Sequence, residues 1–367
     1  MTERAKTTAS ASRPERRTFI KLSLATFLTG SATGGAFAQT AWTALGQPVS
    51  RIPWLQDVRR VIIDTDPGTD DLLALLMLLG SPTITTDAIT VAPGNVEYAQ
   101  EIRNALYLAE RFGNGKVPVY RGLDHPLMGH PYPRAGFIHG RSGLGELNIP
   151  DEGLPLSKGS AATAIVNIVS EHPGEVTLLA LGGLTNIALA LLLDQSIATK
   201  IRGIVVVGGR YQGIGTNVSF NSMVDPEAAD LVLKSGAPIV MTGDLGQDAM
   251  LGPADFDRIR SFHTKRSDIF IKSNVGRLHF EMEQRHKPGA TYNDPLAAAM
   301  VIDPSIIEQF EQVHVSVELN GSETRGAYVF GATHIFTGDS VLPNVAIASQ
   351  GNPARFRNVV FQALRRA

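Results

Sequence analysis

The chain has 367 residues, 33 basic and 35 acidic side chains, a formal net charge of −2 and no cysteine. Its length allows one or two domains, and 43% hydrophobic residues are typical of a globular protein and exclude wholesale disorder. The lack of cysteine excludes disulfides and thiolate metal sites, which leaves oxygen and imidazole as metal ligands, and the near-neutral charge argues against a nucleic-acid binder.

The first 38 residues have the pattern of an export signal. Arg16 and Arg17 precede a mildly apolar run over 22–28, and a small-x-small motif ends at Ala38. This pattern resembles a twin-arginine signal and predicts cleavage near Ala38, which gives a periplasmic or secreted protein with no membrane association. An uncleaved anchor is the alternative, but the apolar run is too short to span a bilayer.

Removing residues 1–38 would change the charge of the protein. The segment holds six basic and two acidic side chains, so the remaining 329 residues carry 27 basic and 33 acidic ones, a net charge of −6. We expect residues 39–57 to form a linker and residues 58–367 to form one domain.

Short apolar runs alternate with helical patterns along that domain. The alternation predicts an α/β fold with a Rossmann-like, mostly parallel (mixed) sheet and helices on both faces. The expected strands are Arg60–Asp64, Ile84–Val91, Val117–Tyr120, Glu175–Leu181, Ile201–Val207 and Ile239–Thr242, and the expected helices include Asp70–Leu79 and Val96–Phe112.

Two stretches interrupt the alternation. Residues 124–157 are rich in Pro, Gly and His and are too long for an ordinary connection, and residues 254–290 have a charged helical pattern. We expect them to form a helical and loop lid over the carboxyl ends of the strands.

Four aspartates follow the first strand: Asp64, Asp66, Asp70 and Asp71. Ligands of parallel sheets bind at the carboxyl ends of strands, and a helix N-terminus favours anions. Crowded carboxylates repel one another unless a cation neutralises them, so the cluster indicates a hard divalent ion with oxygen ligands. The alternative, in which Asp70 or Asp71 caps the helix and the others occupy the turn, explains one or two aspartates but not four.

Residues 64–71, DTDPGTDD, closely resemble the DTDPGxDD signature of the inosine–uridine-preferring nucleoside hydrolase family. The resemblance implies hydrolysis of the N-glycosidic bond of ribonucleosides to ribose and free base. It also implies a small-molecule nucleoside as partner and a homodimer or homotetramer. Weaker matches follow in the family's order along most of residues 59–365, at 94–95, 139–140, 182–188, 220–221, 225–229, 294–297 and 324–326.

The resemblance also implies one Ca²⁺ ion as the cofactor. Its matching ligands are the carboxylates of Asp66, Asp71 and Asp294 and the backbone carbonyl of Leu181, a set that suits calcium's preference for oxygen. Asp70 matches the catalytic base that takes a proton from the attacking water.

Other matching residues are expected to bind the substrate. Asn95 and Asn221 match sugar-binding residues, and Asp64 would lie beside the pocket as a supporting or ribose-contacting group. His139 lies in the expected lid loop, where it is either a substrate contact or a plain loop residue. The loop over 209–218 is shorter than in the family, so Asn217 could take over a neighbouring sugar contact.

Two positions depart from the family pattern. Asn293 stands where the best-known members carry a histidine that can protonate the leaving base, and an amide can only donate a hydrogen bond there. Ser219 stands where the family usually has a glutamate at the sugar's 5′ end. These changes motivate an alternative function, a catalytically weakened or divergent member that binds nucleosides or other pentoses. A phosphotransferase of the haloacid-dehalogenase type, with Asp64 as nucleophile, fits the later motifs poorly.

Overall fold

A computed structural model of the chain describes residues 48–145, 147–150, 155–209, 218–331 and 341–366, and the structural statements below concern these residues. The expected export signal and the first part of the expected linker lie outside them. Residues 48–57 pack into the domain, because Pro48 and Val49 pair with a strand of the main sheet and Leu55 is fully buried.

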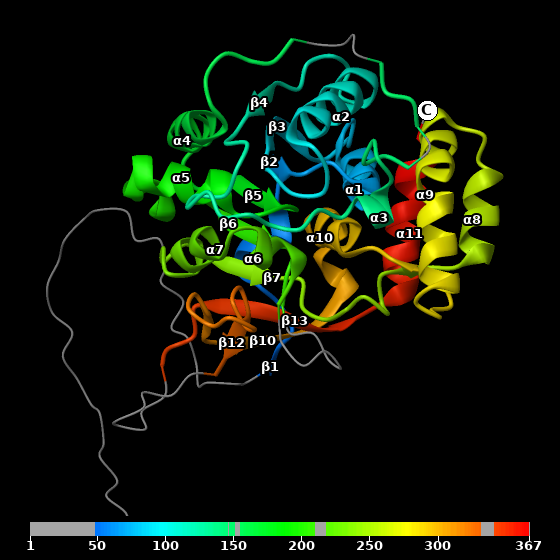
Figure 1. The fold of residues 1–367 in the computed structure, drawn as a ribbon. Helices are drawn as coiled ribbons and strands as arrows, with labels where there is room; N and C mark the ends of the chain where they lie inside the picture. Colours follow the sequence, from blue (N-terminus) through cyan, green and yellow to red (C-terminus); the bar gives the residue numbers. More distant parts are fainter. Residues whose placement is uncertain (1–47, 146, 151–154, 210–217, 332–340, 367) are drawn as a thin grey trace, which may run out of the picture. The chain divides into compact units, whose positions relative to one another are not determined.

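The described part of the chain builds one nine-stranded sheet at its centre (Figure 1). Its strands in spatial order are β1 (Pro48–Val49), β10 (Ile307–Val313), β13 (Val345–Gly351), β7 (Ile239–Met241), β6 (Gly203–Val206), β5 (Val176–Ala180), β2 (Arg60–Thr65), β3 (Thr85–Val91) and β4 (Val119–Arg121).

The strands from β13 to β4 run parallel, and β10 is antiparallel to both of its neighbours. The expected mostly parallel, mixed sheet is therefore confirmed. The parallel strands read as apolar runs because helices cover both of their faces; β2, for example, is buried from Val61 to Thr65.

Two sets of helices cover the sheet (Figure 1). Their buried side chains form two separate apolar cores, one on each face of the sheet. One face carries α1 (Thr69–Leu78), α2 (Tyr98–Phe112), α10 (Asn293–Ile302) and α11 (Pro353–Leu364), and the other carries α4 (Ala161–Glu171), α5 (Thr185–Leu193) and α7 (Pro226–Leu233).

Helix α1 is completely enclosed, because all ten of its residues are buried. It packs against α10, α11 and a long helix, α9 (Lys265–Glu283). A helix that is apolar around most of its circumference is typical of a protein core. Asp70 and Asp71, in the first turn of α1, therefore lie at the end of a buried helix.

The two expected interruptions touch each other. Residues 254–290 form α8 (Pro253–Arg260), α9 and β9 (Ala290–Thr291), which pairs with β8 (Met250–Leu251). The loop over 124–157 contains α3 (Gly136–His139). The rings of Phe137 on α3 and Phe280 on α9 lie 5.9 Å apart, edge to face.

The smaller elements complete the chain. None of the helices in the described ranges is long and apolar enough to cross a membrane. The remaining elements are η1 (Pro53–Asp57), η2 (Gln195–Thr199), α6 (Phe220–Val224), η3 (Pro304–Ile306), and the paired strands β11 (Val315–Val317) and β12 (Tyr328–Phe330).

The strand order reverses direction next to β2. From β2 the chain proceeds through β3 to β4 at one edge, and it then returns to β5 on the other side of β2. Such a reversal separates the loops that follow the two strands, and ligands of open α/β sheets bind there. The segments after β2 and β5 begin with Asp66 and Leu181, so two expected metal ligands flank this point.

Candidate functional site

The turn between β2 and α1 fixes Asp71. Gly68 is the N-cap of α1, and its N–H donates to Asp71 Oδ2 at 2.8 Å. The Thr65 hydroxyl donates to Asp71 Oδ1 at 2.5 Å. The capping interpretation is therefore correct for Asp71. It does not exclude a metal, because each carboxylate oxygen keeps a further lone pair.

Three carboxylates converge at the start of α1. Asp70, Asp71 and Asp294 each offer an oxygen, and these oxygens all lie within 4.8 Å of one another. Asp294 comes from the first turn of α10, which packs along α1. All three residues are buried, so the group has the spacing and the oxygen chemistry of a site for a hard cation.

Asp66 lies beside this group but is not one of the three. Its side chain is enclosed by two glycines: a Cβ on Gly94 would lie 1.8 Å from Asp66 Oδ2, and one on Gly182 would lie 2.6 Å from Oδ1. Both positions must therefore stay glycine for the carboxylate to fit. Asp66 Oδ2 has no hydrogen-bond donor within the described ranges, and its assignment as a ligand stays a prediction.

Burial raises the pKa of most carboxyls in the cluster. It raises the pKa of Asp64 to about 7 and that of Asp71, with help from Asp70, to about 6. Burial also raises the pKa of Glu101, on α2, to about 8, and it holds those of Asp66 and Asp294 well above their usual values. So many buried carboxylates need a positive partner in order to ionise.

Four buried oxygens of the cluster lack a hydrogen-bond donor among the residues that the structure describes: Asp64 Oδ2, Asp66 Oδ2, Asp70 Oδ1 and Glu101 Oε2. Buried polar atoms are normally satisfied, and a cation can satisfy several oxygens at once. The residues present therefore fit a bound metal ion.

Asp70 differs from its neighbours in its charge environment. Arg277 Nη1 on α9 lies 3.0 Å from Asp70 Oδ1. Burial raises the pKa of Asp70, but the charge of Arg277 and the nearby His139 outweigh it, and the pKa falls below its usual value. Asp70 is therefore the carboxylate that stays ionised even without a metal.

The structure brings His139 to the edge of the site. Its Nδ1 accepts the Thr69 N–H at 3.1 Å, lies 2.9 Å from the Thr69 hydroxyl and lies 3.6 Å from Asp70 Oδ1. Burial lowers the pKa of His139 to about 4, so the ring is neutral at neutral pH, and acceptance at Nδ1 assigns its proton to Nε2.

The asparagines expected to bind the sugar support the cluster in different ways. Asn95 Nδ2 donates to the Asp66 carbonyl at 2.8 Å and lies 3.4 Å from Asp71 Oδ2. The Asn221 amide donates to the Leu181 carbonyl, the expected fourth ligand. Asn217 lies outside the described residues, and its role stays a prediction.

The remaining expected residues hold defined places. Asp64 Oδ1 accepts from the Thr90 hydroxyl at 2.6 Å and from the Asn186 amide at 2.8 Å. Asn293 is the first residue of α10 and is half-buried. Ser219 is the N-cap of α6, and its hydroxyl is engaged with Ser222.

Sequence reasoning missed Arg277 and Glu101. Glu101 accepts the Val96 N–H at 2.9 Å and is fully buried. Its position on the same helical face as the buried Ala105 and Leu108 was a usable signal, because a charged residue on an apolar face needs a reason. Arg277 gave no local signal, since its partner lies far away in the sequence.

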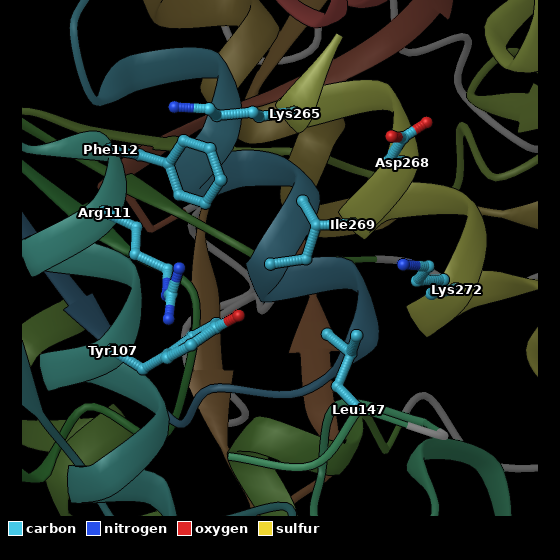
Figure 2. A pocket seen from close by; sticks show the side chains of 8 residues that line it. All are labelled: Tyr107, Arg111, Phe112, Leu147, Lys265, Asp268, Ile269 and Lys272. Atoms are coloured by element: carbon cyan, nitrogen blue, oxygen red, sulfur yellow. The ribbon is translucent and has the colours of Figure 1, made fainter. Parts of the chain in front are cut away.

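A separate pocket of about 410 Å³ lies between α2 and α9 (Figure 2). No residue of the carboxylate cluster lines it, so it is a different feature from the candidate site. Figure 2 shows its lining side chains, which are Tyr107, Arg111, Phe112, Leu147, Lys265, Asp268, Ile269 and Lys272.

Comparison with known proteins gives a consistent result. The model of the family "Inosine-uridine preferring nucleoside hydrolase" matches residues 61–358. The chain is 36% identical over 276 residues to the inosine-uridine preferring nucleoside hydrolase of Crithidia fasciculata, covering 74% of this chain and 87% of that protein. It is 37% identical over 268 residues to uridine nucleosidase 1 of Arabidopsis thaliana, with coverage of 71% and 79%.

Solved structures agree with the sequence matches. A plant nucleoside hydrolase superposes with a TM-score of 0.77 at 28% identity, covering 84% of this chain and 99% of the other. A purine-preferring ribonucleoside hydrolase from Gardnerella vaginalis gives 0.76 at 29% identity, covering 84% and 98%.

Proposed function

The chain belongs to the inosine-uridine preferring nucleoside hydrolase family, and on that premise we propose that it is a calcium-dependent ribonucleoside hydrolase in which Asp70 activates the attacking water. Family members are glycosidases that act on N-glycosyl compounds, and their substrates are small nucleosides. The observation that carries the proposal is the buried group formed by Asp70, Asp71 and Asp294 at the start of α1.

The proposed cation is Ca²⁺, held by Asp66, Asp71, Asp294 and the Leu181 carbonyl. Support comes from the donor chemistry: every group is a hard oxygen, and calcium accepts six to eight such ligands with flexible geometry. When bound, a divalent ion neutralises the carboxylates and makes water more acidic.

In the proposed reaction, water adds to C1′ of the ribose while the C1′–N bond breaks. The base leaves with the bonding electron pair and takes up a proton, and ribose takes the hydroxyl. Asp70 accepts the proton that the water loses, a role that suits a carboxylate kept ionised by Arg277. Positive charge that develops on the sugar is stabilised by the surrounding carboxylates.

Asn293 and Ser219 concern the departure of the base and the binding of the sugar's 5′ end. Asn293 at the start of α10 can donate a hydrogen bond to the departing base but cannot protonate it. Ser219 is engaged in the cap of α6. The interpretation as a weakened binding protein rests on these two positions, and the hydrolases among the relatives do not favour it.

The test is ribose release by the purified protein from a panel of purine and pyrimidine nucleosides with Ca²⁺ present. Asp70→Asn should lower kcat by about 10³-fold or more, because it removes the general base. Absence of hydrolysis of every nucleoside by calcium-loaded protein, or full activity in Asp70→Asn, would contradict the proposal.

We also propose that residues 1–38 direct twin-arginine export to the periplasm or beyond and that the mature protein is a homodimer or homotetramer. The paired Arg16 and Arg17 support the first part. Replacing both with lysine should keep the protein in the cytoplasmic fraction, and light scattering on the mature chain measures its mass. A monomer would contradict the second part.

A further inference from the structure

We propose that Glu101 on α2 is a positioning residue of the metal site: its buried carboxylate holds the loop 94–96 against the expected ligands and adds a negative charge near the expected cation. The inference rests on the proposed function only in taking the acidic cluster as the metal site, and it does not depend on which group activates the water. It gives a role to a buried acid on an otherwise apolar helix face.

Glu101 lies in the first turn of α2 and reaches back to the loop that precedes the helix. Its Oε1 accepts the Val96 N–H at 2.9 Å, and the side chain is fully buried. Burial raises the pKa of Glu101, while the backbone N–H groups of Val96, Gly94 and Asn95 act against the rise. The carboxyl therefore interacts with three consecutive backbone donors, which fixes the path of the loop.

The same loop touches the site at several points. The backbone of Gly94 packs so closely on Asp66 that a Cβ there would lie 1.8 Å from Asp66 Oδ2. Asn95 Nδ2 donates to the Asp66 carbonyl at 2.8 Å and lies 3.4 Å from Asp71 Oδ2. The Asn95 carbonyl accepts the N–H of Ala135, the N-cap of α3, at 2.8 Å. A shift of the loop would therefore disturb two expected ligands and the start of α3.

Hydrogen bonding alone does not explain a charged residue at this position, because the amide oxygen of a glutamine could also accept the Val96 N–H. Burial and Asp71 raise the pKa of Asp66, and the charge of Glu101 raises it further. Glu101 Oε2 has no hydrogen-bond donor within the described ranges. Repulsion among these carboxylates is unfavourable without a cation, but each charge attracts a divalent ion that binds among them.

The experiment separates the charge of Glu101 from its hydrogen bond. Glu101→Gln keeps an oxygen that can accept the Val96 N–H but removes the charge, and Glu101→Ala removes both. The matched control is Asp225→Asn. Asp225 is also a fully buried carboxylate that accepts backbone N–H groups, from Leu127 and Ala228, but it caps α7 and is not part of the acidic cluster.

Calcium affinity is measured by calorimetry on chelator-treated protein at pH 8.5, above the pKa of about 8 of Glu101. Both Glu101 variants should bind calcium about 10-fold more weakly, because a unit charge near the ion is lost, and Asp225→Asn should bind it as the wild type does. In the metal-free protein, hydrogen exchange of the Val96 amide should be faster in Glu101→Ala but not in Glu101→Gln.

Kinetics at saturating calcium test the positioning role separately. Glu101→Ala should raise KM for a nucleoside by about 10-fold, because Asn95, the expected sugar contact, loses its fixed position, while Glu101→Gln should keep KM near the wild-type value.

Three results would overturn the inference. The first is wild-type calcium affinity in a folded Glu101→Gln variant. The second is unchanged Val96 exchange and unchanged KM in Glu101→Ala. The third is an equal loss of calcium affinity in Asp225→Asn, which would show that any lost buried carboxylate weakens binding. Failure of the proposed function looks different, since the wild-type protein would then bind no calcium or release no ribose.

Discussion

The two ends of helix α1 each receive a buried arginine from α9, and they use it in opposite ways. At the C-terminal end, Arg266 Nη1 donates to the Leu76 carbonyl at 2.8 Å. Arg366 Nη1 donates to the Met77 carbonyl there at 3.0 Å. Cations are favourable at this end, because the helix dipole is negative there and the last carbonyls lack intrahelical partners.

At the N-terminal end the same residue type opposes the helix dipole. Arg277 is accommodated there because the Asp70 carboxylate faces it, and Asp70 raises the pKa of Arg277 above its usual value despite burial, which acts to lower it. Burial, with a contribution from Arg366, lowers the pKa of Arg266 to about 10, so that residue stays charged at neutral pH. Arg266, which the helix dipole favours, has a structural role. Arg277, which the helix dipole opposes, lies at the candidate site.

Removing the metal should separate the two ends most clearly. Exhaustive chelation is expected to abolish ribose release and to lower the melting temperature, while the protein stays folded because the C-terminal end of α1 is untouched. Calcium at about 100 times its Kd should return roughly 2.7 kcal/mol of stability. The measurements are ribose release and differential scanning calorimetry before and after calcium is restored. Full activity in protein shown to be metal-free would break the comparison.

The pH dependence of the metal-free protein should come from the N-terminal end. Burial raises the pKa of Glu101 from 4.5 to about 8, so its stabilising contribution is complete below about pH 4.5 and is lost as the pH rises toward 8. The free energy of unfolding should therefore fall between pH 5 and 8, by up to about 1.4 kcal/mol per pH unit for this group.

Glu101→Gln tests that dependence, since it removes one titrating group and should make the fall seen in urea unfolding at pH 5, 6, 7 and 8 shallower. The rest of the fall should come from Asp64 and Asp71, whose pKa values lie in the same range. Arg266→Gln is the control and should keep the wild-type slope, because the pKa of Arg266, about 10, lies above this pH range. A stability that rises with pH in the metal-free wild type would show that Glu101 is ionised in the fold.

Arg266→Gln should destabilise the protein without affecting catalysis. The change leaves the buried Leu76 carbonyl without its charged donor, which costs about 2 kcal/mol. Urea unfolding measures the loss, and kcat should remain close to that of the wild type. A large fall in kcat would mean that the two ends of α1 are coupled through the helix.

Four changes are compared: metal removal, Glu101→Gln, Arg266→Gln and Arg366→Ala. The last should have the smallest effect. Arg366 is half-buried, and its removal both breaks the bond to Met77 and relieves repulsion of Arg266, so we expect a loss of less than about 1 kcal/mol. Urea unfolding of the single and double variants measures this ranking. A loss larger than that of Arg266→Gln would reverse the order proposed for this end.

Much of the fold was predictable because the signals are local. The strand expected over Arg60–Asp64 is Arg60–Thr65, and the helix expected over Asp70–Leu79 is Thr69–Leu78. Both are defined by runs of apolar residues that end at polar turns. The antiparallel position of β10 between β1 and β13 was not predicted, because strand order depends on contacts between distant segments.

The site was predictable to the extent that its groups lie within one motif. Asp70 and Asp71 are adjacent in the sequence, and the structure brings Asp294 to them as the resemblance implied. The contact of Arg277 with Asp70 joins α9 to α1 and depends on how two helices pack, which no spacing in the sequence encodes. The capping of Asp71 and its expected metal binding had been alternatives, yet one side chain has the geometry for both.

The complete burial of α1 makes the acidic site a part of the cooperative core. The backbone amides of α1 can exchange with solvent only when the surrounding helices and the sheet separate, so they should report global unfolding in hydrogen-exchange experiments. A bound ion should raise the free energy of global unfolding, because it binds the folded state. The amides of α1 should therefore exchange more slowly when calcium is present.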